Sequence, residues 1–298
     1  MTSAINTDGL TKDYGQHRGI FDLNLEVHEA EAFGFIGPNG AGKTTTLRLL
    51  MDLIRPDRGR ASILGMDTQR DGVKIRRLTG YLPGEAPEYP NHTGERIIDL
   101  LAHLRGGVDP KQVTDLAKRF DLDLHRKYRT YSHGNKQKVW LIQAFMHDPQ
   151  LLFLDEPTTG LDPLMQQTFR ELIKEARERG ATIFLSSHVL PEVQEICDRI
   201  GVVHDGSLRQ VGTMEELRIS HVHRVDATVA TALDAARLTK IPGVAGVIVS
   251  DHHLQCTVTG TMEPLLEMLL PAGVVTLDST EMSLEEIFLA QYGQPAQP

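Results

Sequence analysis

GPNGAGKTT, residues 37–45, fits the pattern G-x-x-x-x-G-K-[ST] and lies between a predicted strand at 32–36 and a helix that begins near Lys43. Glycines in such a loop let successive backbone N–H groups point at phosphate oxygens, and the following helix N-terminus adds a partial positive charge. Lys43 can reach the β- and γ-phosphates, and the Thr44 hydroxyl can ligate Mg²⁺. A chance match is the alternative, which the strand–loop–helix context disfavours. The predicted phosphate-binding residues are Gly37, Pro38, Asn39, Gly40, Ala41, Gly42, Lys43, Thr44 and Thr45.

LLFLDEP, residues 151–157, places two acids at the end of another predicted strand. Its apolar residues indicate a buried parallel strand, and Asp155 follows at the carboxyl end, where α/β sheets bind ligands. Asp155 is suited to hold the magnesium shell, and Glu156 is suited to orient and deprotonate an attacking water. Two acids that merely face solvent are the alternative, which the nearby phosphate loop disfavours.

Strands alternate with helices through the first two thirds of the chain. The pattern predicts helices between about 94 and 129, a strand at 151–154, a helix at 163–179 and a strand at 181–185. This order predicts an α/β fold with a mixed, mostly parallel sheet that is covered on both faces. Residues 94–147 are predicted to form a helical subdomain within an ATP-binding domain at 1–217.

The pattern of predicted strands and helices changes after about residue 219. We predict strands at 222–230, 245–250, 254–260 and 274–279, and helices at 231–240, 263–270 and 283–292. The β-α-β-β-α-β order is that of a small ferredoxin-like α+β domain, here placed at 218–293. Residues 294–298 are predicted to be a frayed tail.

Composition limits the partners and the location. The chain of 298 residues carries 31 Lys and Arg against 40 Asp and Glu, and this net charge of -9 argues against nucleic acid as the main partner. No stretch approaches the roughly 20 apolar residues that span a bilayer, and the start lacks a signal-peptide pattern. We therefore expect a cytoplasmic chain, and any membrane process that it serves needs another polypeptide in the membrane.

Three further motifs give the sequence a family resemblance. YSHGNKQK at 131–138 opens a helix, GLDP lies at 160–163, and LSSHVL carries His188. In this order, together with the phosphate loop and LLFLDEP, they resemble the ABC transporter ATPases over about residues 5–217. The C-terminal domain with its SLEEIFLAQYG ending is similar to that of bacterial drug-exporter ATPases. The resemblance implies ATP as substrate, with Mg²⁺, and efflux as the direction of transport.

The resemblance also implies roles and partners. Family members form a head-to-tail sandwich, as a homodimer or with a paired subunit, in which each ATP lies between the phosphate loop of one chain and the signature helix of the other. Separate transmembrane permease subunits complete the transporter, and the ATPase chains bind to them at the cytoplasmic face of the membrane. His188 resembles the switch histidine, with a satisfied loop histidine as the alternative, and the alternative for Tyr14 is an exposed turn aromatic. The remaining nucleotide contacts implied are Tyr14 (stacking on adenine), Ser132, Gly134, Asn135 and Asp162, of which Asp162 could also simply cap a helix.

Two departures from the family pattern concern turnover. Gly84 stands where the family usually has a glutamine that senses magnesium, and His133 and Asn135 replace a glycine and a glutamine of the signature. We expect modest basal turnover that depends on a membrane partner to order the loop at 84. A weakly hydrolysing nucleotide switch is one alternative function, and a soluble ABC-class ATPase is another. His221, His223 and the His252-His253 pair suggest a metal site, with a solvated cluster as the favoured alternative.

Overall fold

The computed structural model describes residues 2–218 and 222–281 and divides the chain into two units, Met1–Thr213 and Met214–Pro298. The division falls slightly before the boundary predicted after residue 217. The predicted helix at 283–292 and the tail at 294–298 lie outside the described residues. Within the described ranges, no helix combines the length and apolar composition that membrane crossing requires.

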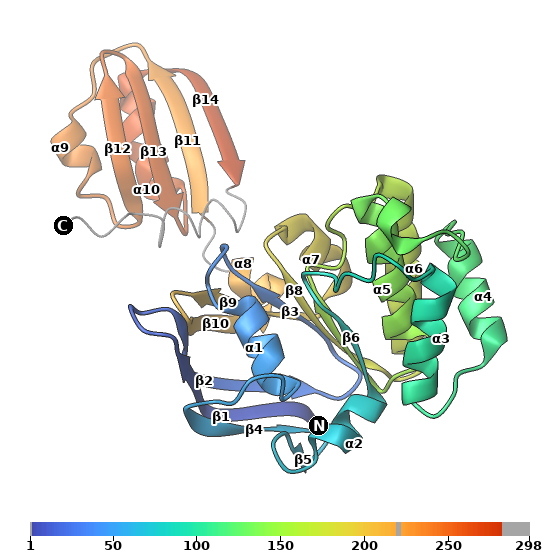
Figure 1. Ribbon diagram of the computed structural model, residues 1–298. Coiled ribbons are helices and arrows are strands. Elements are labelled where there is room, and N and C mark those ends of the chain that lie inside the picture. The colour runs from blue at the N-terminus through green and yellow to red at the C-terminus, as the bar shows by residue number, and fades with distance from the viewer. Residues whose placement is uncertain (1, 219–221, 282–298) are drawn as a thin grey trace. The chain divides into compact units, whose positions relative to one another are not determined.

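A six-stranded sheet runs through the first unit in the order β10-β9-β3-β8-β7-β6 (Figure 1). Its strands are β3 (Ala32–Ile36), β6 (Thr79–Leu82), β7 (Leu151–Asp155), β8 (Thr182–Ser187), β9 (Arg199–His204) and β10 (Ser207–Thr213). All neighbours are parallel except β9 and β10. Every residue of β7 and β8 is buried, as in a sheet with both faces covered. The predicted α/β fold with a mixed sheet is confirmed.

Four phenylalanines hold the middle strands of this sheet together. The ring of Phe184 on β8 lies 5.8 Å from Phe33 and 5.6 Å from Phe35 of β3, and 5.8 Å from Phe153 of β7, between centroids. All four side chains are fully buried. Replacing a buried phenylalanine by alanine typically costs about 3–5 kcal/mol. This cluster therefore fixes β3, β7 and β8, the strands that lead into the predicted site, relative to one another.

A second, antiparallel sheet has the order β2-β1-β4-β5. Its strands are β1 (Ser3–Asp13), β2 (Gly19–His28), β4 (Arg58–Ile63) and β5 (Met66–Asp67). The sequence predicts a turn at Asp8-Gly9, but β1 continues through both residues. Its pairing with β2 shifts register between Thr7 and Leu10, and Gly9 has a φ of +56°. The turn prediction is wrong, because the turn-forming dipeptide is accommodated as a β-bulge.

Helices α1 (Lys43–Leu50), α2 (Gly72–Leu78), α6 (Pro163–Glu178) and α7 (Leu190–Ile196) connect the strands. The apolar pattern extends α1 to Ile54, but the helix ends one turn earlier, at Leu50. Asp52 adopts a left-handed conformation with a φ of +54°, and the Leu53 N–H donates to the Arg48 carbonyl at 2.9 Å. This arrangement satisfies the last helical carbonyls and stops the helix.

The helical region predicted at 94–147 contains α3 (Gly94–Leu104), α4 (Pro110–Arg119), a 3₁₀ turn (Tyr128–Thr130) and α5 (His133–Phe145). Figure 1 shows α3, α4 and α5 gathered on one side of the parallel sheet. The Thr93 hydroxyl accepts the Arg96 N–H at 3.2 Å, and the Asp109 carboxylate accepts the Lys111 N–H at 2.9 Å. These side chains fix where α3 and α4 begin.

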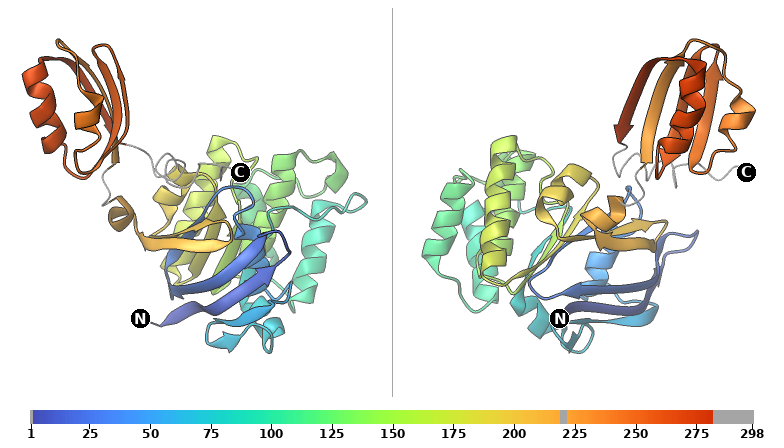
Figure 2. Two further views of the ribbon diagram at one scale, coloured as in Figure 1. Left: turned by 90° about the vertical axis from the view of Figure 1, so that its left-hand side faces the viewer. Right: turned by 180° about the vertical axis from the view of Figure 1, so that it is seen from behind.

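The second unit contains α8 (Met214–Arg218), α9 (Ala235–Leu238), α10 (Glu263–Leu269), a 3₁₀ turn (Leu270–Ala272) and the strands β11 (Val222–Val229), β12 (Val244–Ser250), β13 (His253–Thr259) and β14 (Val274–Glu281). The sheet order is β12-β13-β11-β14, with antiparallel neighbours, and Figure 2 shows α9 and α10 on the same face. The predicted ferredoxin-like order is confirmed. The helix predicted at 231–240 is confined to four residues: the Asp234 carboxylate fixes its start by accepting the Ala236 N–H, and Thr239 is its C-cap.

His147 lies where the helical region meets the parallel sheet. Its Nε2 atom is 3.2 Å from the Thr79 carbonyl of β6, and its Nδ1 atom is buried without a hydrogen-bond partner among the described residues. Burial, together with the nearby Arg105 charge, lowers the pKa of His147 to about 4. The fold therefore holds this imidazole in its neutral form.

We expect His147 to make stability depend on pH between about 6.5, its ordinary pKa, and about 4. Its contribution is fully present above the unfolded pKa and is lost as pH falls toward the folded pKa, because the unfolded chain binds the proton first. Thermal unfolding from pH 7.5 to 4.5 should therefore show a smaller decrease in Tm for His147→Gln than for wild type. The exposed His103→Gln is the control. Parallel Tm curves for wild type and His147→Gln would contradict the assignment.

Candidate active site

Three loops that carry predicted residues leave the same edge of the parallel sheet. Strand β8 lies between β3 and β7, and the register pairs Ile36 with Ser187 and Asp155 with Ser186. Residues that follow these positions therefore emerge side by side, where open α/β sheets bind ligands.

The predicted phosphate loop turns directly into α1. Pro38, Asn39 and Gly40 form its exposed part, and Thr45 lies in the first turn of the helix. Gly42 is the N-cap with a φ of +105°, and a Cβ there would lie 2.3 Å from Cδ1 of Ile20. Glycine is required at this position both by the left-handed backbone and by the closeness of β2.

A chain of polar contacts runs from the phosphate loop to the end of β8. The Lys43 ammonium donates to the Gly37 carbonyl at 2.8 Å and lies 3.3 Å from Oε1 of Glu156. The other carboxylate oxygen of Glu156 is 2.7 Å from Nδ1 of His188. Lys43 is buried and His188 is half-exposed, so the chain leads from the interior to the surface. Glu156 thus lies between a cation and an imidazole.

The backbone of Glu156 has a φ of +51°, which is unusual for a side chain of this size. Its N–H donates to the Ser186 carbonyl at 3.1 Å, which holds the residue against β8. Such a conformation costs on the order of 1–3 kcal/mol and persists only where the surroundings impose it. The strained backbone directs the Glu156 side chain toward Lys43 and His188.

Asp155 is fully buried and accepts hydrogen bonds from two hydroxyl groups. The Thr44 hydroxyl donates to Oδ2 at 2.7 Å, and the Ser186 hydroxyl donates to Oδ1. The carboxylate and the Thr44 hydroxyl thus bring two oxygen ligands together, of the hard type that Mg²⁺ prefers. This donor set fits the magnesium role predicted for Thr44 and Asp155.

Gly84 packs against the same carboxylate. A Cβ at this position would lie 2.8 Å from Oδ2 and 3.1 Å from Cγ of Asp155. Because Thr44 and Ser186 hold that carboxylate in place, a side chain at 84 must displace either the carboxylate or the loop. From the sequence, Gly84 is a flexible residue that replaces the usual glutamine. The structure adds a steric reason for glycine, because a Cβ at this position would meet the Asp155 carboxylate.

The predicted signature residues lie together at the start of α5. Ser132 caps α5 by accepting the Asn135 N–H at 3.2 Å, and a Cβ on Gly134 would lie 2.5 Å from the Gly160 carbonyl. His133 also packs on Gly160, with its Cδ2 atom 2.4 Å from where a Cβ of Gly160 would stand. Among the described residues, no hydrogen bond joins 132–135 to 37–45.

Two other predicted nucleotide contacts have local roles within the chain. Asp162 caps α6 by accepting the Met165 N–H at 3.0 Å, which is the alternative that the sequence left open. Tyr14 is 56% exposed, and the Lys12 ammonium lies 5.7 Å from its ring centroid. An exposed ring is available for stacking, and the predicted contact with adenine stays a prediction.

Comparison with known proteins identifies the family. Residues 20–159 match the model described as ABC transporter. The bacitracin transport ATP-binding protein BcrA of Enterococcus faecalis is 37% identical over 227 residues, covering 75% of this chain and 72% of that protein. This chain belongs to the ABC transporter family.

Other similar proteins extend the match to the whole chain and to a solved structure. The daunorubicin resistance ATP-binding protein DrrA3 of Streptomyces coeruleorubidus is 34% identical over 300 residues, covering 96% of this chain and 95% of that protein. A solved ATP binding subunit of an ABC transporter superposes with a TM-score of 0.67 at 31% identity, covering 72% of this chain and 92% of the solved one. The chain is therefore an ABC transporter ATP-binding subunit and an ATPase, and the soluble-ATPase and switch alternatives are not favoured.

The structure of this ABC ATPase adds residues that sequence reasoning missed. Ser186 holds Asp155, and the buried Gln137 of α5 donates to the Pro157 carbonyl at 3.2 Å, which ties the signature helix to the loop after Glu156. The pair Ser186-Ser187 was a usable signal, because its hydroxyls end a predicted strand and the carboxyl ends of parallel strands meet at one edge of a sheet. Gln137 gives no such signal, since its role depends on how α5 packs.

Among residues 222–281, the histidines of the second unit are not brought together as a metal site. His253 Nε2 pairs with Asp226 Oδ1 at 2.7 Å, and His223 Nδ1 lies 3.3 Å from the Ser279 hydroxyl. Within residues 2–218 and 222–281, no group of three or more metal-ligating side chains is found. His221 lies outside the described residues.

We expect Gly84→Gln, which introduces the usual family residue, to lower ATPase activity rather than raise it. A side chain at 84 must move Asp155 or the loop, and misplacing a catalytic group by about 1 Å can cost roughly 100-fold in rate. Steady-state ATPase assays at saturating Mg²⁺ test this, with the exposed neighbour Glu85→Gln as the control. Turnover of Gly84→Gln above wild type would show that the glycine is only a lost ligand.

Proposed function

We propose that this chain drives export as one of a pair of ATP-hydrolysing subunits, at the cytoplasmic face of the membrane, through separate transmembrane subunits. The contact chain Lys43–Glu156–His188, beside the Asp155–Thr44 pair, is the observation that supports the catalytic part of this proposal. Lys43 and the amides of 37–45 bind the phosphates, since they lie at a helix N-terminus.

Glu156 is the proposed general base and His188 its partner. A carboxylate held by two fixed groups is oriented to accept a proton from water, and the imidazole hydrogen bond keeps it turned toward the site. Mg²⁺ would be held by Thr44 and Asp155 and would neutralise charge on the phosphates. In the proposed site, neighbouring side chains thus divide three tasks: phosphate binding, Mg²⁺ binding and base catalysis.

A second copy of the chain, or a paired subunit, completes each site. Ser132, Gly134 and Asn135 stand at the start of α5, and this helix N-terminus can meet the γ-phosphate bound by the partner chain. Asp162 would meet the partner chain near the same interface, and Tyr14 would stack on adenine in its own chain.

Export is supported by two relatives, one named for bacitracin transport and one for daunorubicin resistance. The second covers the ferredoxin-like unit as well as the ATPase unit, so the two-unit arrangement occurs in a protein named for drug resistance. We therefore assign the transporter to efflux. The C-terminal unit has no predicted nucleotide motif and is proposed to regulate or stabilise the dimer.

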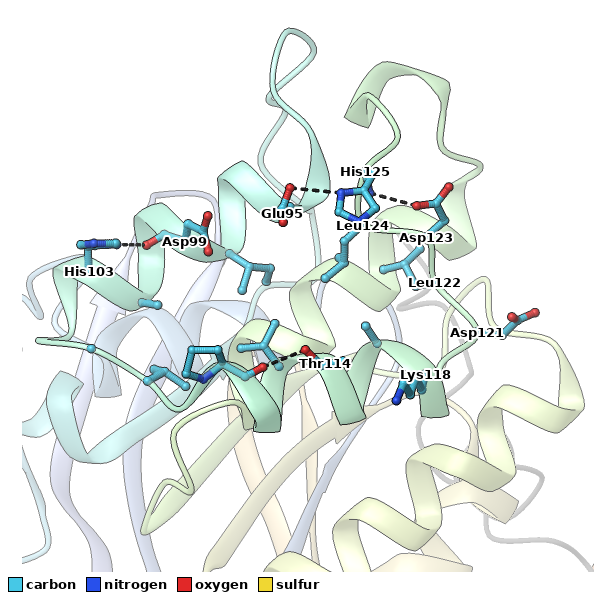
Figure 3. A pocket seen from close by; sticks show the side chains of 17 residues that line it. Glu95, Asp99, His103, Thr114, Lys118, Asp121, Leu122, Asp123, Leu124 and His125 are labelled. Carbon is cyan, nitrogen blue, oxygen red and sulfur yellow. Dashed lines mark hydrogen bonds and ion pairs between the residues drawn. The ribbon is translucent and has the colours of Figure 1, made fainter.

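A groove in the helical region is the proposed docking surface for the membrane subunits (Figure 3). It has a volume of about 740 Å³ and lies between α3, α4 and the segment 121–125. Its apolar wall includes Ile98, Val113 and Leu122. The lining also contains one lysine, Lys118, and four acids: Glu95, Asp99, Asp121 and Asp123. We assign to it a short cytoplasmic helix of the permease with an apolar ridge and basic flanks, because its charge would complement the acids.

We expect Glu156→Gln to bind ATP but to hydrolyse it about 10²–10⁴-fold more slowly, because the general base is lost. The full-length variant should then accumulate as a dimer with ATP and Mg²⁺, measured by size-exclusion chromatography with light scattering. The double variant Lys43→Ala/Glu156→Gln is the control and should stay monomeric, because its phosphate loop lacks the cation. Only monomer in Glu156→Gln at saturating ATP would contradict the proposed mechanism.

We expect the charge reversals Asp99→Lys and Asp123→Lys to weaken co-purification with the permease, because they remove the acids that attract its basic flanks. Glu178→Lys, an exposed reversal on α6, is the matched control and should retain the permease. Equal recovery of the permease with all three variants, each folded by circular dichroism, would exclude this groove as the docking surface.

A further inference from the structure

Glu192 lies in the first turn of α7, next to the proposed catalytic histidine but outside the contact chain. The helix has Val189 as its N-cap and begins at Leu190, so the turn between β8 and α7 contains His188. Glutamate at this position of a helix commonly accepts the N–H of the N-cap residue and closes the helix start. Here Glu192 reaches the N-cap N–H of Val189 indirectly, through the Ser187 hydroxyl.

The Ser187 hydroxyl acts as a relay between the turn and Glu192. It accepts the Val189 N–H at 2.9 Å and donates its own proton to Oε2 of Glu192 at 3.1 Å. Because a hydroxyl has one proton, the carboxylate fixes its direction and leaves its lone pairs for the N–H. The relay closes the turn around His188, whose Nδ1 atom lies 2.7 Å from Glu156.

Glu192 also faces the loop that follows Glu156. Burial raises the pKa of the Glu192 carboxyl, while hydrogen bonds from Thr158 and Ser187 lower it. The ionisable groups that act on it are Glu156 and His188. Its Oε1 atom is buried without a partner that meets full hydrogen-bond geometry among the described residues. A carboxyl group is thus enclosed between the two loops that carry the proposed base and its histidine.

We propose that Glu192 is a positioning residue for ATP hydrolysis, which holds the Ser187–Val189 turn against the loop of Thr158 so that His188 stays on Glu156. The proposal rests on the roles proposed for Glu156 and His188. Glu192 acts through His188 and touches neither phosphate nor metal ligand. Loss of its carboxylate frees the Ser187 hydroxyl to rotate, which loosens the turn and lets the imidazole leave the base.

A helix cap without a role in turnover would predict a different pattern. Such a residue changes Tm, and its effect on activity is the same whether or not His188 is present. A residue that acts through His188 has no further effect once that imidazole is gone. Epistasis between positions 192 and 188 therefore separates the two roles.

The experiment measures ATPase kcat, KM and Tm of the full-length chain. Glu192→Ala should lower kcat by about 10- to 100-fold with KM for ATP unchanged, because the phosphate loop is untouched. Glu192→Gln should keep most of the rate, since its amide oxygen still accepts the Ser187 proton. Glu195→Ala is the matched control, because Glu195 lies on the same helix in an exposed pair with Arg170.

The decisive comparison uses His188→Ala with and without Glu192→Ala. We expect the second substitution to have no further effect on kcat in that background. Equal fold losses from Glu192→Ala in both backgrounds, or a normal kcat for Glu192→Ala, would overturn the positioning role and leave the role of His188 standing. A normal kcat for His188→Ala would overturn both the proposed role of His188 and the inference about Glu192.

Discussion

The register between β3, β8 and β7 is the constraint on which the site depends. Asp155 pairs with Ser186, and Ile36 pairs with Ser187, so the residues that follow each strand emerge side by side. A slip by one residue would turn each side chain to the opposite face of the sheet. The buried phenylalanine cluster between these strands resists such a slip, because it interlocks all three strands. Packing of buried rings thus fixes the geometry of the proposed catalytic site.

In the proposed mechanism, the groups at this edge connect nucleotide binding to base catalysis. Lys43 is shared between backbone carbonyls of the phosphate loop and the Glu156 carboxylate, which His188 also holds. A phosphate oxygen is an acceptor that competes with Glu156 for the same ammonium group. Binding would therefore free one carboxylate oxygen at the moment when an attacking water needs a base, while His188 keeps the other oxygen in place. The left-handed backbone at Glu156 is consistent with this function, because strain of this kind persists at sites that need one fixed direction.

Much of the fold and of the chemistry could be predicted from the sequence, because both rest on local patterns. The phosphate loop, LLFLDEP and the alternation of strands and helices depend on residues close in sequence, and the ferredoxin-like order follows from periodicity. Features that depend on contacts between residues far apart in the chain could not be predicted from the sequence. Asp8-Gly9 has the composition of a turn but becomes a bulge through its pairing with β2. Gly84 suggests a lost ligand until the approach of its Cβ position to Asp155 is known, and the contact of Glu192 with Ser187 depends on how the turn after β8 folds.

The central claim is that the phosphate loop of one chain meets the signature helix of another. Disulfide formation between two singly substituted chains, Asn39→Cys and Asn135→Cys, tests this claim most directly. The native Cys197 and Cys256 are buried, and burial raises the pKa of both thiols, so neither competes. A disulfide forms only when Cα atoms approach within roughly 7 Å. We predict a covalent heterodimer when the two chains are mixed with ATP and oxidant, and none without ATP. Absence of that heterodimer at saturating ATP would contradict the account.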